Sequence, residues 1–167
     1  MSSSPDSTIL ELTSTDVECT QQLAFKLAGL LRGDEIICLQ GSLGAGKTAF
    51  AQGLGQGFGI KEPINSPTFT LIQEYQAKDR DIVMYHIDLY RLESADEVHM
   101  LGLDDYLYGA GICVIEWPEQ ATNSIPNERL WIKLEVVAND HRTISLHAHG
   151  EPYQRLLTDF KQLICAL

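Results

Sequence analysis

Residues 41–48 read GSLGAGKT and match the pattern G-x-x-x-x-G-K-[ST] at every defined position. The glycines let successive backbone N–H groups turn inward around anionic oxygens. Lys47 supplies a positive charge for the β and γ phosphates of a nucleotide, and the hydroxyl of Thr48 is a hard oxygen ligand for Mg²⁺. The pattern therefore predicts a phosphate-binding loop that holds ATP together with Mg²⁺.

A chance match is the competing explanation of this pattern, and its place along the chain argues against it. The apolar residues 35–39 immediately before it predict a strand that is buried on both faces. The residues after it predict a helix, whose positive N-terminal end adds to the attraction for phosphate. A strand, a glycine-rich turn and a helix form the context that this pattern requires.

Two acidic residues each follow an apolar run that predicts a strand. Asp88 ends the run 82–87 and Glu116 ends the run 112–115. In open parallel sheets ligands bind beyond the carboxyl ends of the strands, so both carboxylates can face the phosphate loop. There a carboxylate can hold Mg²⁺, directly or through water, or polarise the attacking water. The alternative is that either acid caps a following helix, but the two together favour a functional role.

Two further positions near these motifs have open interpretations. Thr68 follows Ser66 and Pro67, and Pro67 favours an extended entry into the next strand. Thr68 can sense the γ phosphate and Mg²⁺, as switch threonines do, although a strand-opening turn fits the composition equally well. Trp117, directly after Glu116, either packs over the rim of the site or contacts a partner protein. His86, two residues before Asp88, can face the same site, but it is assigned no role.

A sheet is needed to position these residues, and the hydrophobic pattern predicts one. Strands are expected at 8–13, 35–39, 69–76, 81–87 and 111–115, with a hairpin at 129–137 and 143–149 that turns at Asn139 and Asp140. Helices are expected from a capping box of Thr15 and Glu18 to Gly33, over 47–58, in short pieces over 94–106, and after Pro152. The order predicts one α/β domain over 8–167 after a flexible tail at 1–7. The expected fold is P-loop NTPase-like, with a mostly parallel sheet, an antiparallel edge and helices on both faces.

Composition limits the classes of partner. The chain has 23 acidic and 12 basic residues and a net charge of -11, so it repels nucleic-acid backbones and anionic membrane surfaces. None of its four cysteines shows zinc-finger or disulfide spacing, which agrees with a reducing compartment. The N-terminal residues do not form a signal peptide, and no apolar run is long enough to span a membrane. A cytoplasmic location is expected.

Three other nucleotide-dependent functions compete with hydrolysis of ATP. A small-molecule kinase would carry an arginine-bearing lid, but the arginines are scattered along the chain at Arg32, Arg80, Arg91, Arg129, Arg142 and Arg155. A GTPase would carry an N-K-x-D segment to bind guanine, and the sequence contains none. A non-catalytic nucleotide sensor would not need both Asp88 and Glu116. The kinase remains the principal alternative.

Four motifs in a fixed order make the chain similar to a known family. They are GSLGAGKT at 41–48, SPTF at 66–69, YHIDLYRL at 85–92 and VIEWPE at 114–119. Together they closely resemble the TsaE family, the small bacterial P-loop ATPases of tRNA threonylcarbamoyladenosine (t6A) synthesis. The resemblance extends over residues 13–126 and is only loose from Asn127 onward.

The resemblance implies a role for each matching residue. Thr48 and Glu116 would be the ligands of Mg²⁺, Asp88 the acid of the second nucleotide motif, and Thr68 part of a switch-like loop. Trp117 would lie beside the site and Val17, at the start of the first helix, near the adenine. The phosphates would be bound by Leu43, Gly44, Ala45, Gly46, Lys47 and Thr48.

The resemblance also implies partners. Members of the family act with TsaD and TsaB, which transfer the carbamoyl group to tRNA, while TsaE hydrolyses ATP to keep the assembly turning over. ATPase activity is expected to be weak alone and stronger with these partners. Because of the net charge of -11, contact with tRNA is expected only indirectly, through TsaD and TsaB.

Overall fold

The computed structural model describes residues 7–67 and 71–165, and within them a seven-stranded sheet is ordered β1-β7-β6-β2-β5-β4-β3. The four central strands β6, β2, β5 and β4 are parallel, as expected, and β3 pairs with β4 in antiparallel orientation. β1 and β7 are also antiparallel to their neighbours, so the sheet has antiparallel strands at both edges rather than one. The strands are β1 (Ser7–Ser14), β2 (Ile36–Gln40), β3 (Ile72–Gln76), β4 (Val83–Asp88), β5 (Ile112–Glu116), β6 (Arg129–Ala138) and β7 (His141–His149).

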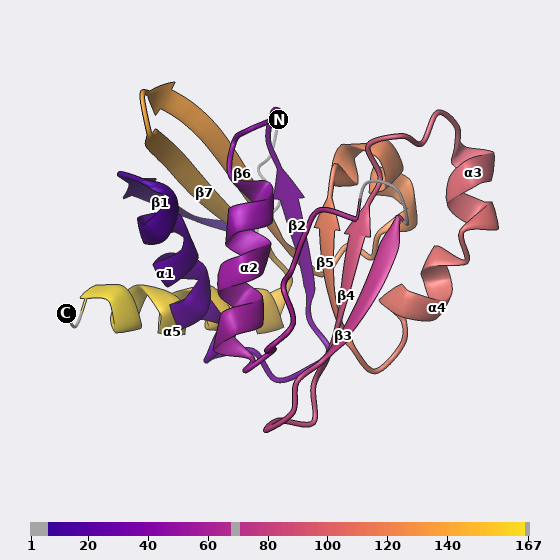
Figure 1. Cartoon of the computed structure of the whole chain (residues 1–167), viewed down its shortest axis with the longest axis horizontal. Helices are drawn as coiled ribbons and strands as arrows, with labels where there is room; N and C mark the ends of the chain where they lie inside the picture. Colours follow the sequence, from indigo (N-terminus) through magenta and orange to yellow (C-terminus); the bar gives the residue numbers. More distant parts are fainter. Residues whose placement is uncertain (1–6, 68–70, 166–167) are drawn as a thin grey trace.

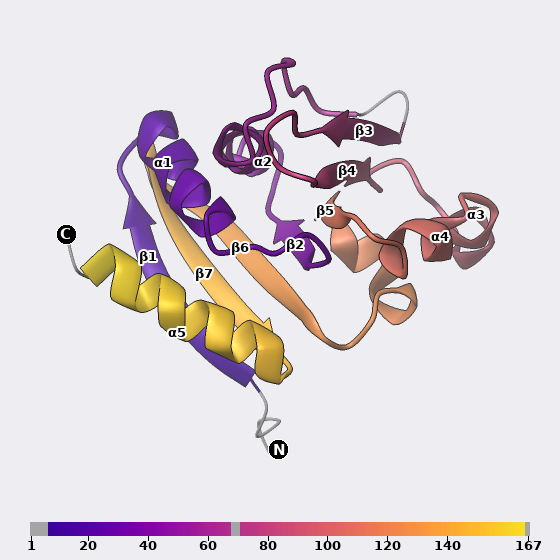
Figure 2. The ribbon, with the colours of Figure 1, turned by 90° about the horizontal axis from the view of Figure 1, so that it is seen from below.

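Helices cover both faces of the sheet, as predicted. One face packs against α1 (Val17–Ala28), α2 (Lys47–Gly57) and α5 (Glu151–Cys165). The other packs against α3 (Ala95–Met100), α4 (Leu103–Leu107) and the 3-10 helix η1 (Pro118–Ser124). Figures 1 and 2 show α1 and α5 at one end of the molecule and α3 and α4 at the other. Within the described residues, no helix has both the length and the apolar character needed to cross a membrane.

The central strands are apolar throughout because each one contributes to two cores. In β2, Ile37 and Leu39 pack under α1 and α2, while Ile36 and Cys38 pack on the opposite face. β5 divides its side chains in the same way, and Cys113 lies in the second core. This two-sided burial explains why these segments show no polar alternation. Burial in these cores raises the pKa of each of these cysteine thiols to about 12.

The predicted ends of the first helix are wrong at both termini. The N-cap is Asp16 rather than Thr15: its carboxylate accepts a hydrogen bond from the Cys19 N–H at 2.7 Å and lies at the positive end of the helix. The helix ends at Ala28, before Gly33. Gly33 instead has a φ of +133° in the loop that leads to β2, where its N–H binds the Glu35 carboxylate.

The glycines of α2 lower its helix propensity, but they allow it to pack closely against α1. A β-carbon at Gly53 would lie 2.3 Å from the carbonyl oxygen of Gln21, and one at Gly57 would lie 2.5 Å from Cβ of Ala28. Any larger residue would push the two helices apart. The same contacts show that α1 and α2 run in the same direction, because Gln21 meets Gly53 and the later residue Ala28 meets the later residue Gly57.

The ends of several strands differ from the prediction. β1 begins at Ser7, so it includes the last residue of the predicted tail, and residues 1–6 lie outside the described residues. β3 begins at Ile72, and the predicted start of this strand at 69, like Thr68, also lies outside them. β4 continues through Asp88 and β5 through Glu116, and these two residues pair in register. The two carboxylates therefore sit side by side at the carboxyl edge of the sheet.

Candidate nucleotide site

The loop over residues 41–48 connects β2 to α2 and has the backbone shape of a phosphate cradle. Gly44 and Gly46 have φ angles of +79° and +105°, which residues with a side chain rarely adopt. A β-carbon at Gly41 would lie 2.7 Å from the Leu134 carbonyl oxygen on β6. The loop ends at the N-terminus of α2, where backbone N–H groups and the helix dipole attract anions.

Lys47 lies over this loop, with 5% of its surface exposed. Its Nζ donates hydrogen bonds to the carbonyl oxygens of Gly41 and Ser42, and lies 4.3 Å from the centre of the Trp117 ring. Burial lowers the pKa of Lys47, and the negative charges of Glu116, Glu119 and Asp88 oppose that shift. An ammonium group has three protons, so two bonds to the loop leave a donor for a phosphate oxygen.

Glu116 and Thr48 form a pair of hard oxygen donors at the start of α2. The Thr48 hydroxyl lies 3.4 Å from both carboxylate oxygens of Glu116, which is 3% exposed. Mg²⁺ prefers such oxygens and takes its remaining ligands from water and substrate phosphates. Across residues 7–67 and 71–165, no three His, Cys, Asp or Glu side chains converge to hold a metal ion. The Thr48 hydroxyl and the Glu116 carboxylate are the kind of oxygen donors that fit Mg²⁺ bound together with a nucleotide.

Asp88 lies next to Glu116 and is also 3% exposed. Its Oδ1 accepts a hydrogen bond from the Tyr90 N–H at 2.9 Å, which is a local turn contact and not a helix cap, because the next helix begins only at Ala95. Its Oδ2 accepts a hydrogen bond from the Ser66 hydroxyl at 3.1 Å. Asp88 thus links the segment that leads to Thr68 with the edge of the sheet that carries Glu116.

Trp117 has an unusual backbone conformation for a bulky residue, with a φ of +60°. This turn brings its ring close to both the Lys47 ammonium and the ring of Tyr90, whose centre lies 4.9 Å away. Strained residues of this kind concentrate at functional sites. A hollow of about 300 Å³ opens beside the ring and the phosphate loop, and Glu119, Lys133 and Glu135 also line it.

Two residues of the site were not predicted. His86, which received no role, is completely buried, with Nε2 2.5 Å from Oε2 of Glu116. Arg142, counted among the scattered arginines, reaches from β7 to donate a hydrogen bond to the Gly44 carbonyl at 3.3 Å. Its Nη1 is buried and has no hydrogen-bond partner in the part of the chain that the structure describes. Arg142 thus brings a second positive charge to the phosphate loop.

The remaining predicted residues differ in how exposed they are and in whether the structure describes them. Val17 is the first residue of α1 and is 54% exposed; because α1 and α2 run in the same direction, it lies at the same end of the pair as the phosphate loop. Leu43 projects from the loop and is 71% exposed, whereas Ala45 is buried. Thr68 lies outside the described residues, so the structure does not place it.

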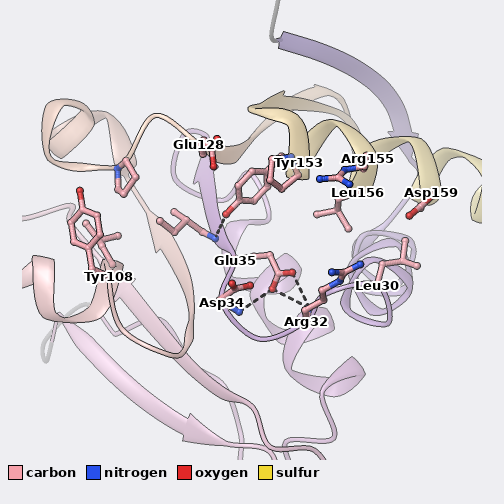
Figure 3. Close-up of a pocket in the computed structure, with 14 residues that line it drawn as sticks. Leu30, Arg32, Asp34, Glu35, Tyr108, Glu128, Tyr153, Arg155, Leu156 and Asp159 are labelled. Atoms are coloured by element: carbon pink, nitrogen blue, oxygen red, sulfur yellow. Dashed lines mark hydrogen bonds between the residues drawn. The ribbon is translucent and has the colours of Figure 1, made fainter.

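A second hollow, of about 470 Å³, lies at the opposite edge of the sheet (Figure 3). It is found where β2 begins, between the loop after α1 and the first turns of α5. Two of its polar groups are already engaged: the Tyr153 hydroxyl binds the Ile36 N–H at 2.8 Å, and the Glu35 carboxylate binds the N–H groups of Arg32, Gly33 and Asp34. Ligands of parallel sheets bind at the other edge, so this hollow is not the candidate site.

Comparisons with known proteins assign the chain to a family. The family described as "Threonylcarbamoyl adenosine biosynthesis protein TsaE" matches residues 14–144. The chain belongs to the TsaE family. The resemblance predicted from the four motifs is therefore confirmed, and the match to TsaE extends past residue 126, through β6 and into β7. The part of β7 that carries Arg142 lies within it.

Individual relatives agree with this assignment. A protein from Bacillus subtilis named tRNA threonylcarbamoyladenosine biosynthesis protein TsaE is 38% identical over 153 residues, which cover 92% of this chain and 94% of the relative. The TsaE protein of Treponema pallidum is 37% identical and covers 82% of this chain and 99% of its own length. The crystal structure of YdiB from Bacillus subtilis superimposes with a TM-score of 0.82 at 32% identity, covering 95% of this chain and 98% of YdiB.

Proposed function

We propose that this chain is the Mg²⁺-dependent ATPase component of tRNA threonylcarbamoyladenosine biosynthesis. Its membership of the TsaE family supports the pathway. The observation that carries the ATPase assignment is the meeting of a glycine-shaped phosphate loop with two buried carboxylates, Glu116 and Asp88, at one edge of the sheet. Nucleotide hydrolysis by P-loop proteins depends on this combination of positioning and electrostatic groups.

The residues of the site would divide the work as follows. Backbone N–H groups over residues 43–48 and the Lys47 ammonium would bind the phosphates, with Arg142 as a second cation. Thr48 and Glu116 would hold Mg²⁺, which, when bound, neutralises charge on the β and γ phosphates. Asp88 would orient the attacking water. Trp117 would cover the site, Val17 would lie near the adenine, and Thr68 would belong to the loop that responds to the γ phosphate.

The alternative, a P-loop small-molecule kinase, has less support. Such a kinase carries arginines on a mobile lid over the acceptor, whereas Arg142 lies on β7, paired with both β1 and β6. Incubation with labelled ATP and candidate acceptors would distinguish the two activities. Label transferred to an acceptor would identify a kinase, and label released as inorganic phosphate would identify an ATPase.

Hydrolysis can be tested through Asp88. We expect the purified chain to hydrolyse ATP weakly alone and faster with TsaD and TsaB, and Asp88→Asn to lower the stimulated rate by about 100-fold, as expected for loss of a general base. The asparagine can still accept from the Tyr90 N–H, so nucleotide affinity should change little. Asp81→Asn, at an exposed position before the same strand, is the charge-matched control. A parental rate in Asp88→Asn would reduce Asp88 to a turn cap.

Contact with tRNA is expected to depend on the partner proteins. We propose that the chain is cytoplasmic and binds TsaD and TsaB through the segment near Thr68 and the rim at Trp117, more strongly with ATP than without it. With a net charge of -11, the chain alone should not bind tRNA measurably near physiological salt. Calorimetric titration of each component, with and without nucleotide, tests this. Tight, salt-sensitive tRNA binding by the chain alone would contradict it.

A further inference from the structure

We infer that His86 is a positioning residue that holds the Glu116 carboxylate so that its Oε1 atom faces the Mg²⁺ of a bound nucleotide. The inference rests on the proposed function and adds to it a residue that acts through Glu116 rather than on the substrate. His86 lies on β4, completely buried, and its Nε2 is 2.5 Å from Oε2 of Glu116.

The contact determines which nitrogen of His86 carries a proton. A carboxylate can only accept hydrogen bonds, so Nε2 must be the donor. Nδ1 is buried and has no hydrogen-bond partner among the described residues. The imidazole therefore donates Nε2–H to Glu116, and no other hydrogen bond of the ring competes with this contact among the described residues.

This bond makes the two oxygens of Glu116 unequal. The Thr48 hydroxyl lies 3.4 Å from each of them, so Thr48 alone does not select one. Because His86 engages Oε2, Oε1 is the oxygen that remains for a metal ion next to Thr48. A hydrogen bond from a neighbouring residue to a metal ligand orients that ligand. Losing such a bond typically costs about 10–100-fold in metal affinity or activity.

The sheet keeps the donor in place. β4 and β5 are parallel neighbours, and His86 pairs with Val114, two residues before Glu116. Successive side chains of a strand alternate between faces, so His86, Asp88 and Glu116 lie on the same face. That face is covered by α2, which begins at Lys47 and carries Thr48 in its first turn. The imidazole is completely buried on this face, as a positioning residue requires.

Two polar substitutions separate positioning from simple packing. The side-chain amide nitrogen of His86→Gln can lie near the original Nε2, whereas that of His86→Asn reaches only the region of Nδ1. We would titrate Mg²⁺ into each variant bound to a fluorescent ATP analogue. His86→Asn should raise the half-saturating Mg²⁺ concentration about 10–100-fold, and His86→Gln should stay near the parent. Affinity for the analogue in EDTA should be unchanged in both.

The controls distinguish the possible failures. Met84→Leu changes a completely buried residue two positions earlier on the same face of β4, and should leave the Mg²⁺ titration unchanged. If His86→Asn does not fold, His86→Phe replaces it as the variant without a donor. If His86→Gln and the variant without a donor gave equal Mg²⁺ titrations, the inference would be overturned while the proposed function stands. The same holds if Met84→Leu showed the same loss. A parent whose nucleotide binding does not respond to Mg²⁺ would overturn the proposed function as well.

Discussion

Lys47→Ala should weaken ATP binding by about 10- to 100-fold, because each charge-assisted hydrogen bond to phosphate contributes roughly 1.5–3 kcal/mol. The Nζ of Lys47 lies within the loop, bonded to the Gly41 and Ser42 carbonyls, so it is already positioned where phosphate oxygens would bind. The loss should not be complete. Arg142 also contacts the loop, and the backbone N–H groups and the helix N-terminus remain. Hydrolysis should fall further than binding, because Lys47 also neutralises charge on the transferred phosphate.

Equilibrium binding of a fluorescent ATP analogue measures this loss directly. Lys61→Ala is a suitable control, because Lys61 is exposed and removing it changes the net charge by the same amount. Thermal unfolding should accompany the measurement, since the alanine also leaves two loop carbonyls without their donor. If the folded Lys47→Ala variant binds and hydrolyses ATP like the parent, residues 41–48 are not a phosphate loop.

The parts of the site that could be predicted from sequence are those that depend on a few neighbouring residues. The phosphate loop is continuous over residues 41–48, and its glycine positions follow from backbone geometry alone. The order of strands and helices predicted an α/β fold, and the apolar character of 35–39 and 111–115 followed from burial on both faces. Asp88 and Glu116 could be paired only because the carboxyl ends of parallel strands meet at one edge.

The parts that sequence reasoning missed depend on distant contacts. His86 meets Glu116 across 30 residues of sequence, and Arg142 meets Gly44 across 98. Neither residue type is unusual in its local setting, so only the strand order identifies them. The role of the α2 glycines also depends on a distant contact: helix propensity disfavours them, whereas close packing against Gln21 and Ala28 of α1 requires them. The antiparallel pairing of β1 with β7 joins the two ends of the chain, and no local pattern predicts it.

Glu116→Gln should remove most of the effect of Mg²⁺ on nucleotide binding. The substitution keeps the size of the side chain and removes the charged oxygen that lies 3.4 Å from the Thr48 hydroxyl. Losing an outer-shell partner already costs about 10–100-fold in metal affinity, so losing the ligand itself should raise the half-saturating Mg²⁺ concentration by at least about 100-fold. Binding in EDTA should not weaken, because the amide no longer repels phosphate.

Loss of a metal ligand should weaken nucleotide binding in the presence of Mg²⁺ and not in EDTA, so comparing the two conditions makes the measurement specific. Glu119→Gln removes the same charge three positions later, at an exposed residue that also acts on the pKa of Lys47. It should therefore strengthen metal-free binding slightly while leaving the Mg²⁺ titration unchanged. A general loss of fold would instead weaken binding in both conditions. If Glu116→Gln and Glu119→Gln give the same Mg²⁺ titration as the parent, Glu116 holds no metal ion, and its bond to His86 serves only the packing of β4 against β5.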